Sequence, residues 1–257
     1  MTTTRPLGDN PIPAGARIAT QMANRTIRLA SRGLMRGKVA LYVTGTEHVP
    51  ATGAVVLAAR HYHHLFDGTS IVTTLSRPIR IMVALDWVTA GPQRRLAESL
   101  CGVAGWPVVL RPDADRYRPE LAADPVRRAA YQRDTTRYLM RAASQSVAIL
   151  GRGEALLMFP EGYPNIDPSF TPKGESNDEF LPTLPGAVRI PLLAQAVGLP
   201  TVPIVPVGLH YRRTGADHWA IQLRFGEPLR IEHRRDATAM VDRLGSAIRD
   251  LSTEGAG

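Results

Sequence analysis

The apolar residues of the chain alternate between strand-like and helix-like patterns along most of its length. Short, nearly continuous apolar runs predict buried strands at 39–44, 54–59, 79–84, 107–110, 154–159, 202–209 and 219–225. Segments with apolar residues three and four positions apart predict helices at 16–36, 68–75, 92–103, 135–151, 187–197 and 238–251. Strands separated by helices indicate an α/β fold, with a mostly parallel, mixed sheet flanked by helices on both faces.

Two polar segments are predicted to be loops. The first spans 112–129, and the second, at 163–184, is rich in Pro, Ser, Asn and Asp. The last two strands are joined by a link short enough for an antiparallel hairpin. One strand is therefore expected to run against the direction of the others.

The predicted first helix is amphipathic and basic. Its cations recur three or four positions apart, at Arg25, Arg28, Arg32 and Arg36. Its apolar residues lie on another face: Met22, Ala23, Ile27, Ala30, Leu34 and Met35. Such a helix either packs on the domain with its arginines in water or lies in a membrane interface. We treat residues 1–38 as a basic N-terminal helical segment and residues 39–257 as a single domain.

The composition narrows the possible partners. A chain of 257 residues with 44% hydrophobic residues can bury one sizeable core. The net charge of +8 comes almost entirely from arginines, which either reflect a compositional bias or bind anionic partners such as lipid headgroups. Aromatic residues make up only 6% and no nucleic-acid-binding module is recognisable, so nucleic acid is not an expected partner. Cys101 is the single cysteine and lies in an apolar context, which favours an inert buried thiol.

The expected location follows from two further patterns. The N-terminal residues do not resemble a signal peptide, and no apolar run approaches the roughly 18–20 residues that a membrane span requires. Together with the basic first helix, these patterns lead us to expect a cytoplasmic protein, peripheral on the inner membrane face.

Titratable residues follow two of the predicted strands. The strand at 54–59 leads to three histidines and a carboxylate, His61, His63, His64 and Asp67. The strand at 154–159 leads to a carboxylate on a turn, Glu161 and Gly162. Because α/β enzymes assemble their sites at the carboxyl ends of strands, we expect these residues to meet there.

Four blocks of sequence occur in a characteristic order. A histidine–aspartate loop at 61–67 is followed by GWPVVLR at 105–111, FPEG at 159–162 and VPIVPV at 202–207. In this order the blocks resemble those of the glycerolipid acyltransferases, the family of the lysophosphatidic acid acyltransferases, over roughly residues 40 to 230. The resemblance implies a glycerol-3-phosphate acyltransferase-like α/β fold and makes 39–257 a single acyltransferase domain.

The histidine–aspartate block departs from the family in its spacing. The family has four residues between the two, whereas five lie between His61 and Asp67. The register of the preceding strand favours His61 as the equivalent residue, with one residue inserted in the loop. Helical geometry favours His63, which is four positions from Asp67, and His64 is a third possibility. The family's Asn before the histidine is Arg60 here, and its Ser is also replaced.

The resemblance implies a reaction. A fatty acyl group would move from an acyl thioester to a hydroxyl of a lysophospholipid, 1-acylglycerol-3-phosphate-like, in phospholipid biosynthesis. The histidine would act as general base and Asp67 would hold the other ring nitrogen. The chain lacks the Gly-x-Ser-x-Gly motif of enzymes that form a covalent acyl intermediate, which favours direct transfer.

The resemblance also implies binding roles. Arg111 would hold the acceptor phosphate, Glu161 would contact the acceptor glycerol or orient that arginine, and Gly162 would let the backbone approach the ligand. We expect no cofactor, because acyl-CoA or acyl carrier protein brings the thioester as a substrate. We expect no metal site, because the loop histidines lack a convincing set of further ligands.

Two alternatives remain open from the sequence. The first is an acyltransferase for a non-phosphate acceptor, which would leave Arg111 with a different task. The second is a non-catalytic lipid- or acyl-binding member of the superfamily, which the lengthened histidine–aspartate loop suggests.

Overall fold

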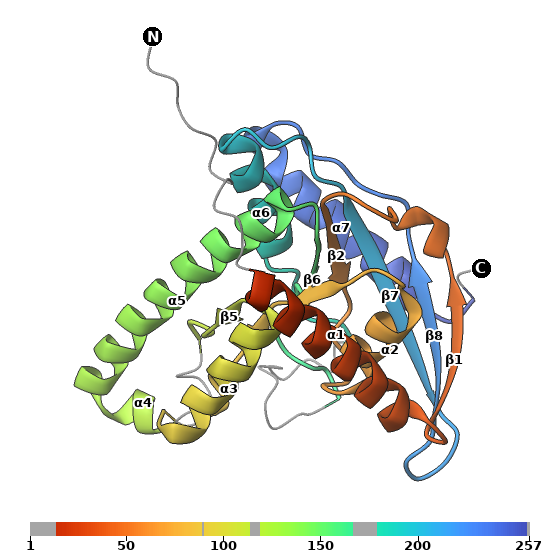
Figure 1. The fold of residues 1–257 in the computed structure, drawn as a ribbon, viewed down its shortest axis with the longest axis horizontal. Coiled ribbons are helices and arrows are strands. Elements are labelled where there is room, and N and C mark those ends of the chain that lie inside the picture. Colours follow the sequence, from red (N-terminus) through yellow and green to blue (C-terminus); the bar gives the residue numbers. More distant parts are fainter. Residues whose placement is uncertain (1–13, 89, 114–118, 167–178, 256–257) are drawn as a thin grey trace.

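A six-stranded mixed sheet forms the centre of the molecule in a computed structural model, which describes residues 14–88, 90–113, 119–166 and 179–255 (Figure 1). In order across the sheet, its strands are β1 (Val39–Thr44), β8 (Trp219–Phe225), β7 (Ile204–Arg213), β2 (Val55–Ala59), β6 (Ala155–Met158) and β3 (Ile79–Ile81). Neighbouring strands are parallel except β7 and β8, which form the expected antiparallel hairpin. The predicted fold class is confirmed.

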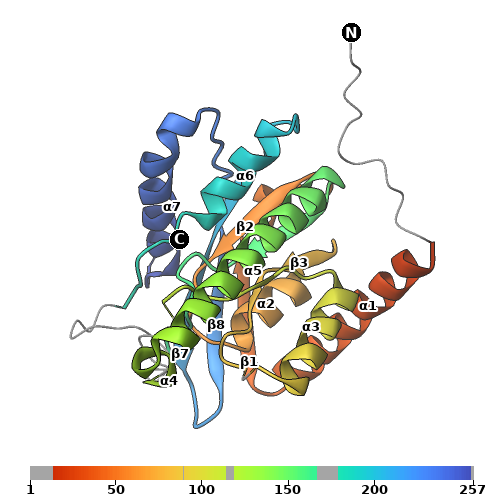
Figure 2. The same ribbon diagram turned by 90° about the vertical axis from the view of Figure 1, so that its left-hand side faces the viewer.

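Helices cover both faces of this sheet (Figure 2). On one face lie α1 (Ala14–Met35) and α2 (Phe66–Thr74), and on the other lie α5 (Pro125–Gly151), α6 (Gly186–Ala196) and α7 (Ala237–Ser252). Strand β2 is fully buried, and its residues alternate between the two cores, with Leu57 on the α2 side and Val56 on the α6 side. This double burial explains why the strand is a continuous apolar run. Two short 3-10 helices, η1 (Thr46–His48) and η3 (Arg234–Asp236), precede β2 and α7.

The run at 79–84 is divided between two sheets, contrary to the single strand predicted. Met82 still donates its N–H to Leu157 in β6, but Val83 donates to Pro107 instead. β4 (Val83–Ala84) and β5 (Val108–Val109) therefore form a separate two-stranded sheet beside α3 (Pro92–Ala104). This small sheet places the end of β5, and with it Arg111, beside the loop that follows β6.

The predicted loop at 112–129 is wrong in its second half. The chain forms α4 (Pro119–Ala123), and α5 begins at Pro125 rather than at residue 135. The Asp124 carboxylate accepts hydrogen bonds from the N–H groups of Val126 and Arg127 at 2.9 and 3.1 Å, and Pro125 suits the first helical position. The segment is polar because most of this first part of α5 faces solvent, and that polarity suggested a loop.

The amphipathic first helix is present as predicted, but its faces are assigned differently. Ile27, Leu34 and Met35 pack on the core, whereas Met22 and Ala30 are exposed. Arg28 is turned inward and donates to the carbonyls at the C-terminal end of α2 and just beyond it: Leu75, Ser76 and Arg77. The exposed basic stripe therefore consists of Arg25, Arg32 and Arg36. No described helix is both long and apolar enough to cross a membrane.

Candidate active site

A histidine–carboxylate pair lies at the carboxyl end of β2. His61 lies two positions after the last residue of the strand, and its Nδ1 lies 2.9 Å from Oδ2 of Asp67 in the first turn of α2. The Asp67 side chain is completely buried, while 17% of the His61 side chain remains exposed. The buried carboxylate fixes the imidazole, and the other ring nitrogen, Nε2, is left for a ligand.

Asp67 accepts hydrogen bonds from two more groups. The backbone N–H of His63 donates to Oδ2 at 2.9 Å, and the hydroxyl of Tyr211, from β7, donates to Oδ1 at 2.5 Å. Burial, together with the nearby Asp67, raises the pKa of Tyr211 well above its ordinary value, so the hydroxyl stays protonated and donates. Both carboxylate oxygens therefore have donors, as a buried charge requires.

The ring of His63 makes its hydrogen bonds with the start of α2 rather than with Asp67. Its Nδ1 accepts from the backbone N–H groups of Leu65 and Phe66, at the N-terminal end of α2. Burial, and then the neighbouring His64, lower the pKa of His63, which suits a neutral ring that accepts these bonds. Of the three histidines left open by the sequence, His61 is the one whose ring is hydrogen-bonded to Asp67. His64 lines the cavity together with His61.

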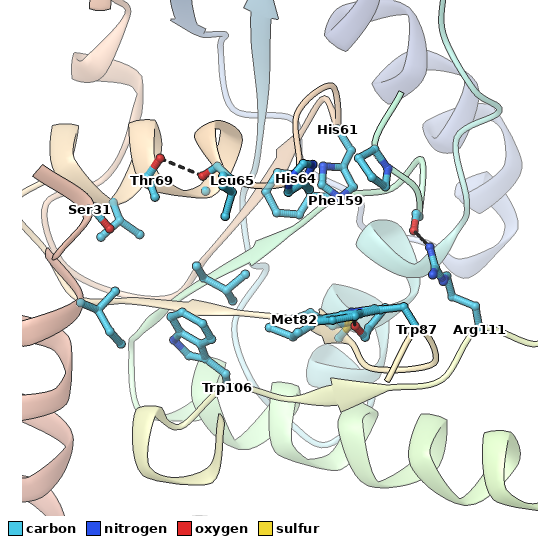
Figure 3. A pocket seen from close by; sticks show the side chains of 18 residues that line it. Ser31, His61, His64, Leu65, Thr69, Met82, Trp87, Trp106, Arg111 and Phe159 are labelled. Atoms are coloured by element: carbon cyan, nitrogen blue, oxygen red, sulfur yellow. Dashed lines mark hydrogen bonds between the residues drawn. The ribbon is translucent and has the colours of Figure 1, made fainter. Parts of the chain in front are cut away.

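A cavity of about 600 Å³ opens beside His61 (Figure 3). Ser31 and Thr69 lie toward one end of its wall, and Arg111 and Trp87 lie toward the other. Much of the remaining wall is apolar: Ile27, Leu65, Val72, Ile81, Met82, Val83, Trp106 and Phe159. The ring of Phe159 also stacks on His61 with centroids 4.4 Å apart, which holds the imidazole at the edge of an apolar space.

Arg111 lines the cavity but is held by an ion pair. Its Nε and Nη2 donate to the Asp86 carboxylate at 2.6–3.0 Å, and the Asp86 side chain is completely buried. Its Nη1 donates to the carbonyl of Gly162 at 2.9 Å, and its guanidinium lies 3.8 Å from the centre of the Tyr163 ring. Arg111 thus joins the end of β5 to the FPEG turn, so any anionic ligand would share it with Asp86.

Glu161 is buried behind the His61 loop. Its carboxyl accepts from the backbone N–H groups of His61 and Leu181, while its Oε2 has no partner among the described residues. Burial raises the pKa of Glu161 to about 7, although nearby Arg60 opposes the rise. The described cavity wall includes Gly162 but not Glu161, so the expected contact between Glu161 and an acceptor stays a prediction.

Gly162 shapes the turn that follows Glu161. Its φ of 75° lies in the left-handed region, and an added Cβ would come within 3.1 Å of Leu184. The residue also presents its carbonyl to Arg111. Gly162 therefore fixes the course of the backbone along the cavity wall.

Comparisons with known proteins identify the family. The model of the family described as Acyltransferase matches residues 40–210, well over half of the chain. The chain belongs to the acyltransferase family. Among solved structures, it is similar to the 1-acyl-sn-glycerophosphate (LPA) acyltransferase PlsC from Thermotoga maritima, with 14% identity and a TM-score of 0.52. That match covers 94% of this chain and 84% of the other, and no curated protein matches the sequence.

The family match confirms the resemblance read from the four blocks, and the PlsC match confirms the fold. Within this acyltransferase, the partners of two site residues were not foreseen from the sequence: Asp86, which pairs with Arg111, and Tyr211, which donates to Asp67. The sequence did contain a signal for Asp86, because this acidic residue comes directly after an apolar run. The structure shows that it is the partner of Arg111. Tyr211 carries no local signal, because it belongs to a strand 144 positions after Asp67.

The raised pKa of Glu161 predicts a pH-dependent stability. Between its ordinary value of 4.5 and about 7, the folded protein keeps a proton that the unfolded chain has lost. This stabilisation is complete below pH 4.5 and is lost as the pH rises through 7. Glu161→Gln should therefore reduce the difference in unfolding free energy between pH 4.5 and pH 8 by up to about 3 kcal/mol. Urea unfolding of the wild type and of Glu161→Gln at both pH values measures this difference. If the unfolding free energies of the two proteins depend on pH in the same way, the raised pKa of Glu161 is contradicted.

Proposed function

We propose that this acyltransferase moves a fatty acyl group from a thioester to a hydroxyl of a lipid acceptor, with His61 as general base. The observation that carries the proposal is the hydrogen bond between His61 and the buried Asp67 at the wall of a mostly apolar cavity. The structurally similar PlsC is described as acting on 1-acyl-sn-glycerophosphate, which supports a lysophospholipid as the acceptor class. The product would then enter phospholipid biosynthesis.

The reaction follows from the free nitrogen of His61. Nε2 takes the proton of the acceptor hydroxyl as its oxygen attacks the thioester carbonyl, giving a tetrahedral intermediate. When the carbon–sulfur bond breaks, the imidazolium returns the proton to the departing sulfur, so an ester and a thiol are formed. Asp67 holds the imidazole in one tautomer and stabilises the imidazolium in between. Direct transfer of this kind requires no covalent acyl-enzyme.

The cavity supplies the surroundings for this transfer. Its apolar wall suits an acyl chain whose carbonyl lies at His61, with acyl-CoA or acyl carrier protein as the thioester donor. In a lysophospholipid the phosphate would lie toward Arg111, and Gly162 would let the backbone come close to the headgroup. No cofactor enters this scheme.

A second candidate acceptor is favoured by one observation. The guanidinium of Arg111 is already paired with the buried Asp86, so its charge is largely neutralised before a ligand arrives. An acceptor whose hydroxyl belongs to an uncharged headgroup would leave this ion pair undisturbed. The two acceptor classes differ in what a phosphate contributes to binding.

Exposed apolar residues beside the cavity support docking on a membrane surface. On α1 they are Ile18, Met22 and Leu29, and on α3 they are Leu96, Leu100 and Val103, at spacings of three, four and seven that place each set on one helix face. The two helices contact each other (Figure 2), and Ile27 of α1 lines the cavity. The exposed arginines of α1 suit anionic headgroups, so we place the protein peripherally on the inner membrane face.

Substitutions in the pair test the reaction. Asp67→Asn and His61→Ala should each lower kcat by about 10⁴ with the fold retained, because the equivalent aspartate change in a serine-type triad has that effect. His63→Ala should mainly lower stability, because it loses the bonds at the start of α2. Thiol release from acyl-CoA with a lysophospholipid acceptor measures turnover, and exposed His233→Ala is a matched control. Near wild-type turnover in Asp67→Asn would overturn the general-base proposal.

A paired substitution tests the acceptor phosphate. Arg111→Ala alone would strand a buried carboxylate, so Arg111→Gln with Asp86→Asn keeps the site neutral and similar in shape. If Arg111 binds phosphate, the double variant should raise the KM for lysophosphatidate about tenfold or more, because a charge-assisted hydrogen bond contributes ~1.5–3 kcal/mol. The KM for a monoacylglycerol with the same chain should change little. Equal changes for both acceptors would select the uncharged acceptor class.

Co-sedimentation with vesicles tests the membrane face. Leu96→Gln with Leu100→Gln should weaken binding to anionic vesicles about tenfold, because each leucine loses part of its burial in the interface. Arg25→Gln with Arg32→Gln should weaken it about thirtyfold and flatten its salt dependence, because each arginine contributes about 1 kcal/mol. Met140→Gln is the matched control, because Met140 is an exposed residue of α5. Unchanged binding by both double variants would show that these are only solvated helix faces.

A further inference from the structure

Tyr211 is the one side-chain hydroxyl that the described structure places on the buried carboxylate of the pair. Its hydroxyl lies 2.5 Å from Oδ1 of Asp67, on the oxygen that His61 does not use. We propose that Tyr211 is a positioning residue that orients Asp67 and sets the pH at which the His61–Asp67 pair loses its proton. This inference rests on the proposed general-base function. The family match ends at residue 210, so Tyr211 lies just outside it.

The two oxygens of the Asp67 carboxylate accept hydrogen bonds from different parts of the chain. Oδ2 accepts from the His61 ring and from the His63 backbone, both in the loop after β2. Oδ1 accepts from Tyr211, which comes from a different element, the central strand β7. A carboxylate held at both oxygens from two directions cannot rotate away from the imidazole without breaking at least one bond.

The tyrosine ring is itself held rigidly. It stacks on Tyr62 with centroids 4.5 Å apart and meets Trp219 edge-on at 5.7 Å. Strand β7 pairs with β2 on one side and β8 on the other, so the backbone of Tyr211 belongs to the sheet. The hydroxyl is therefore presented from a fixed position rather than from a mobile loop.

The charges around Asp67 and Tyr211 indicate in which direction loss of the hydroxyl would change the pH dependence of the pair. Besides His61, the ionisable groups facing the carboxylate and the hydroxyl are Arg60, Tyr62, His63 and Glu161, with His64 beside His63. Burial keeps the Tyr211 hydroxyl protonated, so it shares the negative charge of Asp67 at every pH of an assay. Without that donor, the buried carboxylate keeps only the His61 ring and the His63 N–H as partners, so its charge stabilises a protonated imidazole more than it does in the presence of the hydroxyl. The pair would then hold its proton to higher pH.

Tyr211→Phe is the direct test, because it removes only the hydroxyl and keeps the ring contacts. The acid limb of the kcat/KM profile should move up by about one pH unit, so activity should fall about tenfold below the limb and much less above it. Tyr138→Phe is the matched control, since its hydroxyl also donates to a carboxylate, Glu98, away from the pair. That variant should leave the profile unchanged.

Two further measurements separate this inference from the proposed function. An NMR titration of His61 needs no turnover, and its midpoint should rise by about one pH unit in Tyr211→Phe. Adding Tyr211→Phe to Asp67→Asn should slow the enzyme little further, because the hydroxyl acts through Asp67. An equal loss at every pH, an unmoved titration midpoint, or full additivity with Asp67→Asn would overturn the inference. An active Asp67→Asn variant would instead overturn the proposed function.

Discussion

The burial of Asp67 is the constraint on which the rest of the site depends. A fully buried carboxylate is costly unless donors reach it, and three groups do so from two parts of the chain: the loop after β2 and strand β7. These parts meet because β2 and β7 are neighbouring parallel strands in the centre of the sheet. The order of strands therefore brings the third donor, the hydroxyl of Tyr211, to a carboxylate that the local loop supplies with the other two.

The position of Asp67 depends in turn on helix α1. Asp67 lies in the first turn of α2, and the C-terminal end of α2 is held by Arg28 through the carbonyl of Leu75, with further bonds to the next two carbonyls. A cation at this end also opposes the partial negative charge of the helix dipole. Helix α1 thus has two roles: it exposes apolar residues such as Met22 to solvent, and it holds α2, which carries Asp67. The outer surface and the site are therefore joined by the packing of α1 on α2.

The sequence predicted what depends on local pattern and missed what depends on distant contacts. The buried strands and the histidine loop were visible because apolar runs end in titratable residues, and strand register pointed to His61. The inward turn of Arg28 was not visible, because periodicity places it with the exposed arginines and only packing against α2 separates it. The start of α5 was visible in Asp124 and Pro125, but the polarity of the segment outweighed that signal. The bond from Tyr211 joins residues 144 positions apart, so only the sheet order could reveal it.

The distribution of charge links the buried site to the surface. The chain has a net charge of +8, and three buried or largely buried arginines have carboxylate partners: Arg60 with Glu179, Arg80 with Glu154 and Arg111 with Asp86. Arg94, which is also buried, donates to the carbonyl of Val88 instead. Such pairing is expected, because an uncompensated buried charge would be strongly destabilising. Part of the excess positive charge is carried by exposed side chains, including Arg25, Arg32 and Arg36. Those arginines lie on and just beyond α1, outside the cavity, whereas the reaction that we propose at His61 depends on the local hydrogen bonds of Asp67.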